Sequence, residues 1–184
     1  MIIRLRYKSA PEPLWVERIH GSMSHSPALP HYILMRHALV IARQHPETPF
    51  GCVIVDAEGD IVAEGIQRQG DNPTWHCELD AINECVRSRV GGDWSKFTLY
   101  TTAEPCPMCM SAILWSGIGQ VVYGTSLETL AKLGWQVIAI PAHEVVARSW
   151  NPGLNVTGGI LEDECNQLLL PRSGTSSGAD SAAT

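Results

Sequence analysis

The stretch Glu-Pro-Cys-Pro-Met-Cys at positions 104–109 holds two cysteines separated by two residues, and a His-x-Glu triplet lies upstream at 76–78. A cysteine pair at this spacing is typical of a redox couple, of half a structural zinc site, or of part of a catalytic one. The positions of these residues in the predicted helices help to distinguish between these three kinds of site. Cys106 and Cys109 begin a predicted helix directly after a predicted strand, and His76 lies in the first turn of another helix. Helix N-termini favour negative charge and so stabilise thiolates. Two thiolates and one imidazole form the ligand set of a catalytic zinc site, because closed structural sites have four protein ligands.

Glu78 follows His76 by two residues, so the two side chains of one helix point in different directions. The carboxylate is therefore a poor second ligand, but in the first helical turn it can face the open coordination position. Water held there by Zn²⁺ has a pKa of about 7. Glu78 can take a proton from that water and pass it to a leaving nitrogen. We predict one Zn²⁺ per chain and Glu78 as the catalytic proton shuttle. The alternative is a zinc module without activity, and an intact Glu78 with a three-ligand set speaks against it.

Alternating helices and strands must hold these side chains in place. A helical pattern over 31–45 precedes a predicted hairpin over 50–65, whose two strands flank a Glu-Gly-Asp turn. Asp71 to Thr74 supply residues that favour a helix start. The further predicted helices cover 75–90, 109–117, 126–134, 142–150 and 160–170, and the further strands cover 96–102, 119–125 and 135–141. A hairpin followed by this alternation predicts a layered α/β domain with a mixed sheet.

The bulk composition narrows the class of protein. With 184 residues the chain is predicted to form one domain over 30–170, with an irregular extension at 1–29 and a disordered Gly/Ser/Ala-rich tail at 171–184. A net charge of −6 argues against a protein whose main task is to bind phosphate backbones. No apolar run suits a signal peptide or a spanning helix, so we expect a cytoplasmic protein with no membrane partner and with reduced cysteines.

The motifs resemble those of the cytidine-deaminase-like superfamily, in the branch of bacterial guanine deaminases and tRNA adenosine deaminases. The matching segments are PFGCVIV, DNPTWHCELDAI, LYTTAEPCPMCMSAILWSG and VVYGT. The resemblance implies a three-layer α/β/α domain with a five-stranded mixed sheet, zinc on His76, Cys106 and Cys109, and Glu78 as proton shuttle. It also implies hydrolytic deamination, a homodimer, and a substrate contact from the amide N–H of Cys77.

The departures from the family pattern concern the substrate. Cys77 stands where relatives carry alanine, and Gln67 stands near the position of their substrate-contacting asparagine. No acid follows Gly134-Trp135, where guanine deaminases carry one, and Glu144 or His143 of the next helix is a candidate replacement. Trp75 is a candidate for stacking on a planar base. The predicted substrate-binding residues are Cys77, Gln67, Phe50, Trp75 and Glu144.

The leading prediction is therefore a zinc hydrolase that deaminates a guanine-like purine base or nucleoside and releases ammonia. The alternative is a tRNA adenosine deaminase, which needs basic residues along the RNA backbone. Here the predicted last helix, ILEDECNQLLL, is acidic. We accordingly expect a small-molecule substrate and no nucleic-acid partner.

Overall fold

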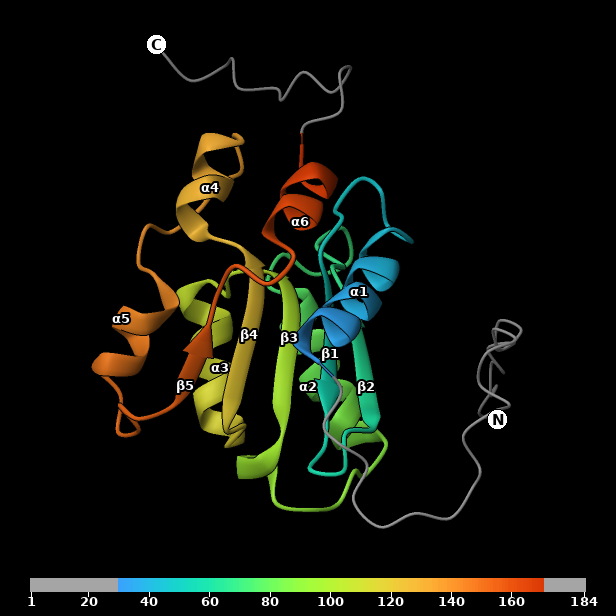
Figure 1. Ribbon diagram of the computed structural model, residues 1–184, viewed down its shortest axis with the longest axis vertical. Helices are drawn as coiled ribbons and strands as arrows, with labels where there is room; N and C mark the ends of the chain where they lie inside the picture. The colour runs from blue at the N-terminus through green and yellow to red at the C-terminus, as the bar shows by residue number, and fades with distance from the viewer. Residues whose placement is uncertain (1–29, 171–184) are drawn as a thin grey trace.

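The computed structural model describes residues 30–170, which form one mixed sheet covered by helices on both faces (Figure 1). The predicted extension at 1–29 and the predicted tail at 171–184 lie outside the described residues. The helices are α1 (His31–Ala42), α2 (Cys77–Arg87), α3 (Pro107–Ser116), α4 (Leu127–Lys132), α5 (Ala142–Ala147) and α6 (Glu162–Leu168). The strands are β1 (Gly51–Val55), β2 (Ile61–Ile66), β3 (Thr98–Ala103), β4 (Gln120–Thr125) and β5 (Asn155–Thr157).

The five-stranded sheet has the order β2-β1-β3-β4-β5. β1 pairs antiparallel with both β2 and β3, whereas β3, β4 and β5 run parallel to one another. The start of β1 and the ends of β2 and β3 therefore meet at the same edge of the sheet. This edge also receives the N-termini of α2 and α3, the helices that follow β2 and β3 in the chain.

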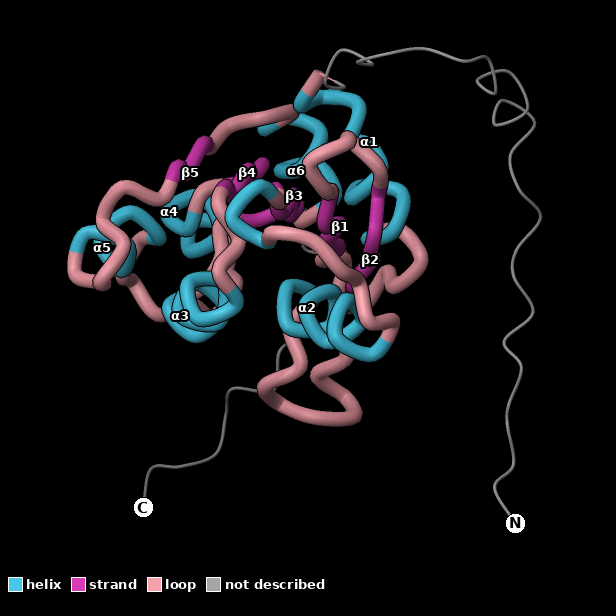
Figure 2. The backbone as a smooth tube through the Cα atoms, turned by 90° about the horizontal axis from the view of Figure 1, so that it is seen from below, coloured by secondary structure: helices cyan, strands magenta, loops and turns pink. Residues whose placement is uncertain are grey.

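Side chains of β1 alternate between two cores, as a strand buried on both faces requires. Cys52 and Ile54 pack with α2 and α3 in one core, and Val53 and Val55 pack with α1 in the other, which also holds Cys165 of α6. Seen along the sheet, α2 and α3 lie on one side of it and α1 and α6 on the other (Figure 2). The predicted three-layer α/β/α architecture with a five-stranded mixed sheet is confirmed.

The prediction of a strand at 135–141 is wrong. This segment has no regular secondary structure, and the fifth strand is Asn155–Thr157, which pairs with β4. The apolar residues Trp135, Val137 and Ile138 line a cavity instead of joining the sheet. Gly134, with φ of +89°, turns the chain out of α4 immediately before them. Trp135 and Val137 are thereby partly buried in the cavity wall, whereas Ile138 and Ile140 remain exposed.

The predicted helix start at Asp71 to Thr74 is also displaced. Asn72 Oδ1 accepts hydrogen bonds from the backbone N–H and the hydroxyl of Thr74 within a turn, and α2 begins only at Cys77 with His76 as its N-cap. The helix-favouring residues thus cap a turn that precedes the helix. Across residues 30–170, no helix has the length and apolar character needed to cross a membrane.

Candidate active site

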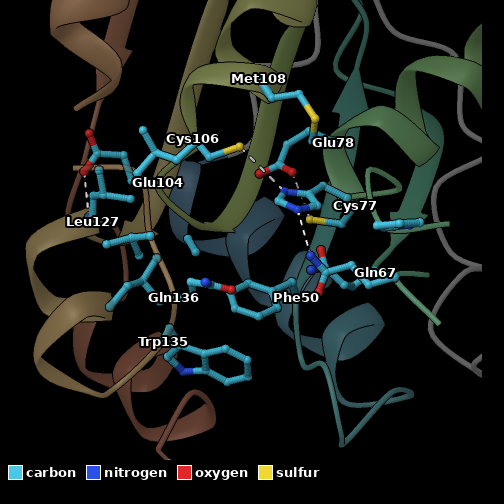
Figure 3. A pocket seen from close by; sticks show the side chains of 17 residues that line it. Phe50, Gln67, Cys77, Glu78, Glu104, Cys106, Met108, Leu127, Trp135 and Gln136 are labelled. Carbon is cyan, nitrogen blue, oxygen red and sulfur yellow. Dashed lines mark hydrogen bonds between the residues drawn. The ribbon is translucent and has the colours of Figure 1, made fainter. Parts of the chain in front are cut away.

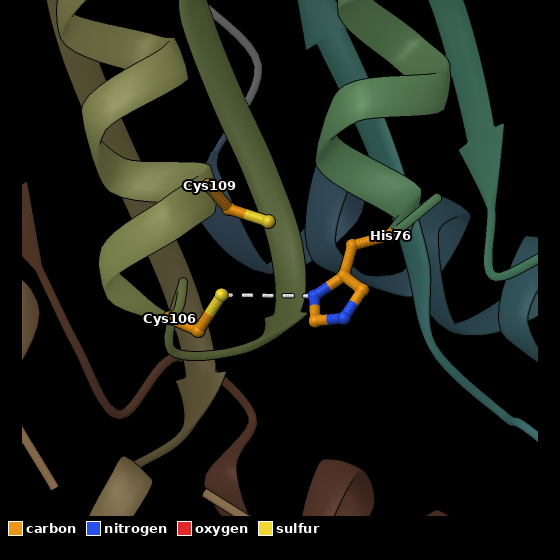
Figure 4. Close-up of side chains that lie close together, drawn as sticks. All are labelled: His76, Cys106 and Cys109. Carbon is orange, nitrogen blue, oxygen red and sulfur yellow. Dashed lines mark hydrogen bonds between the residues drawn. The ribbon is translucent and has the colours of Figure 1, made fainter. Parts of the chain in front are cut away.

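The three predicted metal ligands lie at the N-termini of two neighbouring helices. His76 is the N-cap of α2, Cys106 is the N-cap of α3, and Cys109 lies in the first turn of α3. Neither side chain accepts a capping hydrogen bond from the backbone of its own helix, and the two point toward each other (Figure 4). His76 Nδ1 lies 3.7 Å from Cys106 Sγ, and the ligand atoms of all three residues lie within 4.8 Å of one another.

The cluster is prepared for a positive ion. The Cys109 thiol donates a hydrogen bond to Cys106, and this bond, helped by His76, lowers the pKa of Cys106 to about 4. The hydrogen bond with Cys106 also raises the pKa of His76. The hydrogen bond to Cys106 and the burial of the side chain raise the pKa of Cys109. At neutral pH the pair of thiols therefore holds one proton and one negative charge, beside two helix N-termini that favour the anion.

The donor set fits zinc. Zn–S bonds of about 2.3 Å and Zn–N bonds of about 2.0 Å in a tetrahedral site place sulfur and nitrogen about 3.5 Å apart. The 3.7 Å separation of Cys106 Sγ and His76 Nδ1 is close to that value. His76, Cys106 and Cys109 can therefore hold one zinc ion, with three protein ligands and a fourth position left for solvent or substrate.

Glu78 lies beside this cluster and is held from two sides. Its side chain is buried, Oε1 accepts a hydrogen bond of 3.0 Å from the Thr101 hydroxyl, and Oε2 accepts one of 3.4 Å from the Cys77 thiol. Burial raises the pKa of Cys77, so at neutral pH its sulfur remains a thiol and can donate this bond. The carboxylate also lines the cavity described next. The orientation of the Glu78 carboxylate is therefore fixed by Thr101 of β3 and by Cys77.

A cavity of about 490 Å³ opens over the cluster (Figure 3). This volume lies within the roughly 300–1,000 Å³ common for small-molecule sites. The zinc-ligand side is formed by His76, Cys106, Cys77 and Glu78. On the side away from Glu78, the rings of Phe50 and Trp135 pack edge to face with centroids 4.8 Å apart (Figure 3). The cavity thus has a polar, anionic end and an aromatic end.

The structure brings three of the five predicted substrate-binding residues to this cavity. Phe50, Gln67 and Cys77 all line it. The other two lie elsewhere: the Trp75 indole N–H donates to Asp80 Oδ1 at 2.9 Å, and the Glu144 carboxylate pairs with Arg148 on the surface of α5. Neither Trp75 nor Glu144 is among the described residues that line the cavity.

Two glutamines that sequence reasoning missed also line the cavity. Gln136 comes from the segment mistaken for a strand, so its position could not be inferred. The Gln69 amide lies 3.0 Å from His76 Nε2. A metal-binding histidine normally has a hydrogen-bond partner on its second ring nitrogen, and Gln69 is that partner here. In the sequence, the position of Gln69 two residues after Gln67, in the loop before His76, is the feature that indicates a place near the site.

Glu104 is a further residue that sequence reasoning missed, although it opens the cysteine motif. The buried carboxylate accepts hydrogen bonds of 2.8 Å from the backbone N–H groups of Leu127 and Ala142, the first residues of α4 and α5. Both ends of the segment that carries Trp135 and Gln136 are thereby tied to the residue two positions before Cys106. A negative charge at two helix N-termini is favourable, and the cavity wall is fixed relative to the zinc ligands.

Comparison with known proteins agrees with this site. A family model of the cytidine and deoxycytidylate deaminase zinc-binding region matches residues 30–125, which contain the whole cluster. The chain is similar to a probable cytosine deaminase from Schizosaccharomyces pombe, with 34% identity over 139 residues that cover 72% of this chain and 82% of the relative. It is also similar to a tRNA-specific adenosine deaminase from Haemophilus influenzae, with 33% identity over 141 residues that cover 74% and 79% of the two chains.

Among solved structures, a guanine deaminase from Nitrosomonas europaea has a similar fold, with a TM-score of 0.66, 25% identity, and coverage of 79% of this chain and 85% of the other. Some relatives are much longer, and the chain spans 27% of a tRNA(Ile)-lysidine synthase from Deinococcus radiodurans. The predicted superfamily and enzyme class are thus confirmed. The chain belongs to the cytidine and deoxycytidylate deaminase zinc-binding family, and it is a zinc-dependent deaminase.

Proposed function

We propose that this deaminase acts on a guanine-like purine, as a free base or nucleoside. Water adds to an amino-bearing ring carbon, the C–N bond to the amino group breaks, and the products are the ring carbonyl compound and ammonia. When bound by His76, Cys106 and Cys109, zinc lowers the pKa of a water molecule to about 7. Glu78 takes the proton from the attacking water and delivers it to the leaving nitrogen.

The observation that carries this proposal is the Gln67 side chain. Gln67 is 7% exposed and lines the cavity. Its side-chain amide carries both a hydrogen-bond donor and an acceptor. A substrate edge that offers one donor and one acceptor, as the lactam edge of a guanine-like ring does, would satisfy both atoms of the amide. The aromatic walls from Phe50 and Trp135 suit a planar ring.

The charge of the cavity supports a base or nucleoside over a nucleotide. Among the described residues that line it, none is lysine or arginine, while Glu78 and Glu104 are acidic. Phosphate groups are usually bound by arginine, lysine or a helix N-terminus. Here the N-termini of α2 and α3 lie at the zinc ligands, and those of α4 and α5 are occupied by Glu104. A substrate with a phosphate group would meet negative charge instead.

Deamination of adenosine in tRNA is the second candidate, because the similarity to the tRNA-specific enzyme from Haemophilus influenzae covers most of both chains. The two candidates share the reaction and differ in what lies beyond the base. A tRNA substrate needs contacts to flanking phosphates and stacking surfaces for the extruded base.

A coupled ammonia-release assay across guanine, guanosine, guanosine monophosphate, adenine, adenosine and cytosine tests the proposal. We expect turnover of guanine or guanosine, and at least tenfold lower kcat/KM for the monophosphate. Gln67→Leu removes the amide at similar volume and should raise KM for the best substrate with unchanged zinc content. A preference for the monophosphate, or an unchanged KM in Gln67→Leu, would contradict the proposed class of substrate.

A further inference from the structure

The loop between β2 and α2, residues 67–76, carries several residues of the cavity. Gln67, Gln69, Pro73 and His76 from this loop line the cavity. The loop has no regular secondary structure and is closed on itself by local hydrogen bonds, such as that from Arg68 N–H to the Trp75 carbonyl at 2.9 Å. Local bonds define its shape but do not determine how it sits against the sheet and the zinc-ligand helices.

One buried carboxylate attaches this loop at both of its ends. Asp80 is 3% exposed, and Oδ2 accepts hydrogen bonds from the Ile66 N–H at 3.1 Å and from Arg68 Nε at 3.3 Å. Its other oxygen, Oδ1, accepts the bond of 2.9 Å from the Trp75 indole. Ile66 and Arg68 flank Gln67, and Trp75 directly precedes His76. The donors to Asp80 therefore lie on both sides of Gln67, the proposed substrate-binding residue, and directly before the zinc ligand His76.

Asp80 is itself fixed relative to the zinc site. Its backbone N–H donates to the His76 carbonyl at 3.0 Å, because it lies one helical turn after His76 in α2. A carboxylate that accepts hydrogen bonds from an arginine and from N–H groups forms charge-assisted bonds, which are about twice as strong as neutral ones. The same residue thus ties the loop to the helix that presents Glu78 and His76.

We propose that Asp80 is a positioning residue of the deaminase, which holds the loop 67–76 so that the Gln67 amide and the His76 imidazole face the cavity together. Asp80 is neither among the residues that line the cavity nor part of the His76, Cys106 and Cys109 cluster. This explains why Trp75, a candidate for base stacking by its sequence position, is turned away from the cavity: its indole N–H is one of the three donors on Asp80.

Asp80→Asn tests this with little change of volume, because an amide nitrogen cannot accept a hydrogen bond. We expect KM for the best substrate to rise about tenfold, as expected for misplacement of a binding group, with a smaller change in kcat. Amide hydrogen exchange in peptides that cover 67–76 should become faster, while exchange in β1 and β3 stays unchanged. Trp75→Phe, which removes one donor, should give a smaller effect of the same kind.

Asp56→Asn is the matched control. Asp56 also accepts two backbone hydrogen bonds, from Glu58 and Asp60, but it lies in the hairpin turn at the opposite end of β1 and β2 from the cavity. This variant should lose stability without a change in KM. If Asp80→Asn likewise lowers only the midpoint of thermal unfolding and leaves KM and loop exchange unchanged, Asp80 is structural and the proposal is wrong.

The kinetic readout depends on the proposed substrate class, but hydrogen exchange does not. If the wild-type protein deaminates no purine base or nucleoside, the proposed function fails, and faster exchange in the loop of Asp80→Asn still supports the positioning role. If the wild type is active and the loop of Asp80→Asn exchanges as before, the positioning role fails alone.

Discussion

The single side chains of the cluster differ in how they hold their protons. Cys106, with a pKa near 4, is a thiolate at neutral pH, whereas the thiol of Cys109 supplies the hydrogen bond that keeps it so. Zinc binding must displace this one proton before both sulfurs can act as ligands. The two cysteines of the motif, equivalent in the sequence, therefore differ in burial and in the direction in which their pKa values are shifted.

This asymmetry predicts which cysteine reacts first. In protein stripped of zinc by a chelator, iodoacetamide at pH 6 should alkylate Cys106 fastest, because its pKa of about 4 leaves it ionised. Its rate should fall only as the pH drops through about 4, and added zinc should protect it. Cys85 and Cys165, buried and with pKa values raised to about 11 and 12, are the internal controls. Peptide mass spectrometry gives the rates, and equal labelling of all three would refute the assignment.

Glu78 provides the test of the chemical step. Glu78→Gln keeps the shape of the side chain and can still accept the Thr101 hydrogen bond, so zinc content and the unfolding midpoint should stay near those of the wild type. It cannot take a proton, and general acid–base catalysis of this kind contributes roughly 10²- to 10⁴-fold. We expect ammonia release to fall by at least 10²-fold. Glu84→Gln, on the exposed face of the same helix, is the control and should remain fully active. Activity that survives in Glu78→Gln would exclude the proposed role.

At the scale of elements, the close approach of β2 to α2 sets the position of His76. Gly65 lies in β2 with no room for a side chain, since a Cβ there would come within 2.0 Å of the Cys77 carbonyl oxygen and 2.6 Å of the Ala81 nitrogen. The first turn of α2, which carries Glu78, thus rests directly on the strand backbone. Gly65 is therefore the residue of β2 that lets the start of α2 come close enough to the sheet to place His76 and Glu78 at the site.

Gly65→Ala should therefore force α2 away from β2. We expect a loss of about 1–3 kcal/mol in the free energy of unfolding, as for other overpacked cores, together with a lower zinc content because His76 precedes the displaced helix. Urea unfolding and metal analysis measure the two effects. Gly70→Ala is the control, because a Cβ at that position meets no atom within 4 Å. An equal stability of the two variants would show that the contact is easily relieved.

The elements also show what the sequence could predict. Helix and strand periods placed the hairpin, β3, β4, α2 and α3, and these are the elements that hold His76, Glu78, Cys106 and Cys109. The segment 135–141 was misjudged because an apolar run has the same appearance whether it joins a sheet or lines a pocket. β5, with the sequence Asn-Val-Thr, is too short and polar to be recognised. The lining of the cavity was the least predictable part, because the loops that contribute Gln69 and Gln136 have no periodic pattern.

At the scale of the whole molecule, two exposed indoles lie side by side on the surface. Trp115 at the end of α3 is 76% exposed and Trp150 after α5 is 60% exposed. The centroids of their rings lie 4.2 Å apart. Exposed aromatic clusters are typical of protein interfaces, and we propose that this surface contributes to a homodimer. Light scattering should then give twice the chain mass of 20.1 kDa.

Trp115→Glu should shift the protein to monomers, because it replaces one of the two exposed indoles by a charged side chain next to Trp150. Val40→Glu, at an apolar position 53% exposed on α1 in the opposite helix layer, is the control and should stay dimeric. A wild-type protein that remains monomeric at high concentration would exclude the dimer, and a dimer unaffected by Trp115→Glu would place the interface elsewhere.

The charge of the whole chain bears on the choice between a small substrate and tRNA. The net charge is −6, and the first turn of α6 carries Glu162, Asp163 and Glu164. A tRNA enzyme gains most of its affinity from cations on phosphates, and this affinity falls steeply with salt. We expect this protein to bind tRNA no more tightly than about 10⁻⁶ M at physiological salt, the upper range of non-specific binding.

Filter binding of tRNA at 50 mM and 200 mM salt measures this, with the tRNA-specific deaminase from Haemophilus influenzae as the positive control. A chain without a phosphate-binding surface should show weak binding at both salt concentrations, because there are few counterions for it to release. Tight binding that falls by orders of magnitude between the two concentrations would reveal such a surface despite the acidic total. It would make adenosine in tRNA the leading substrate, with the same His76, Cys106, Cys109 and Glu78 performing the reaction.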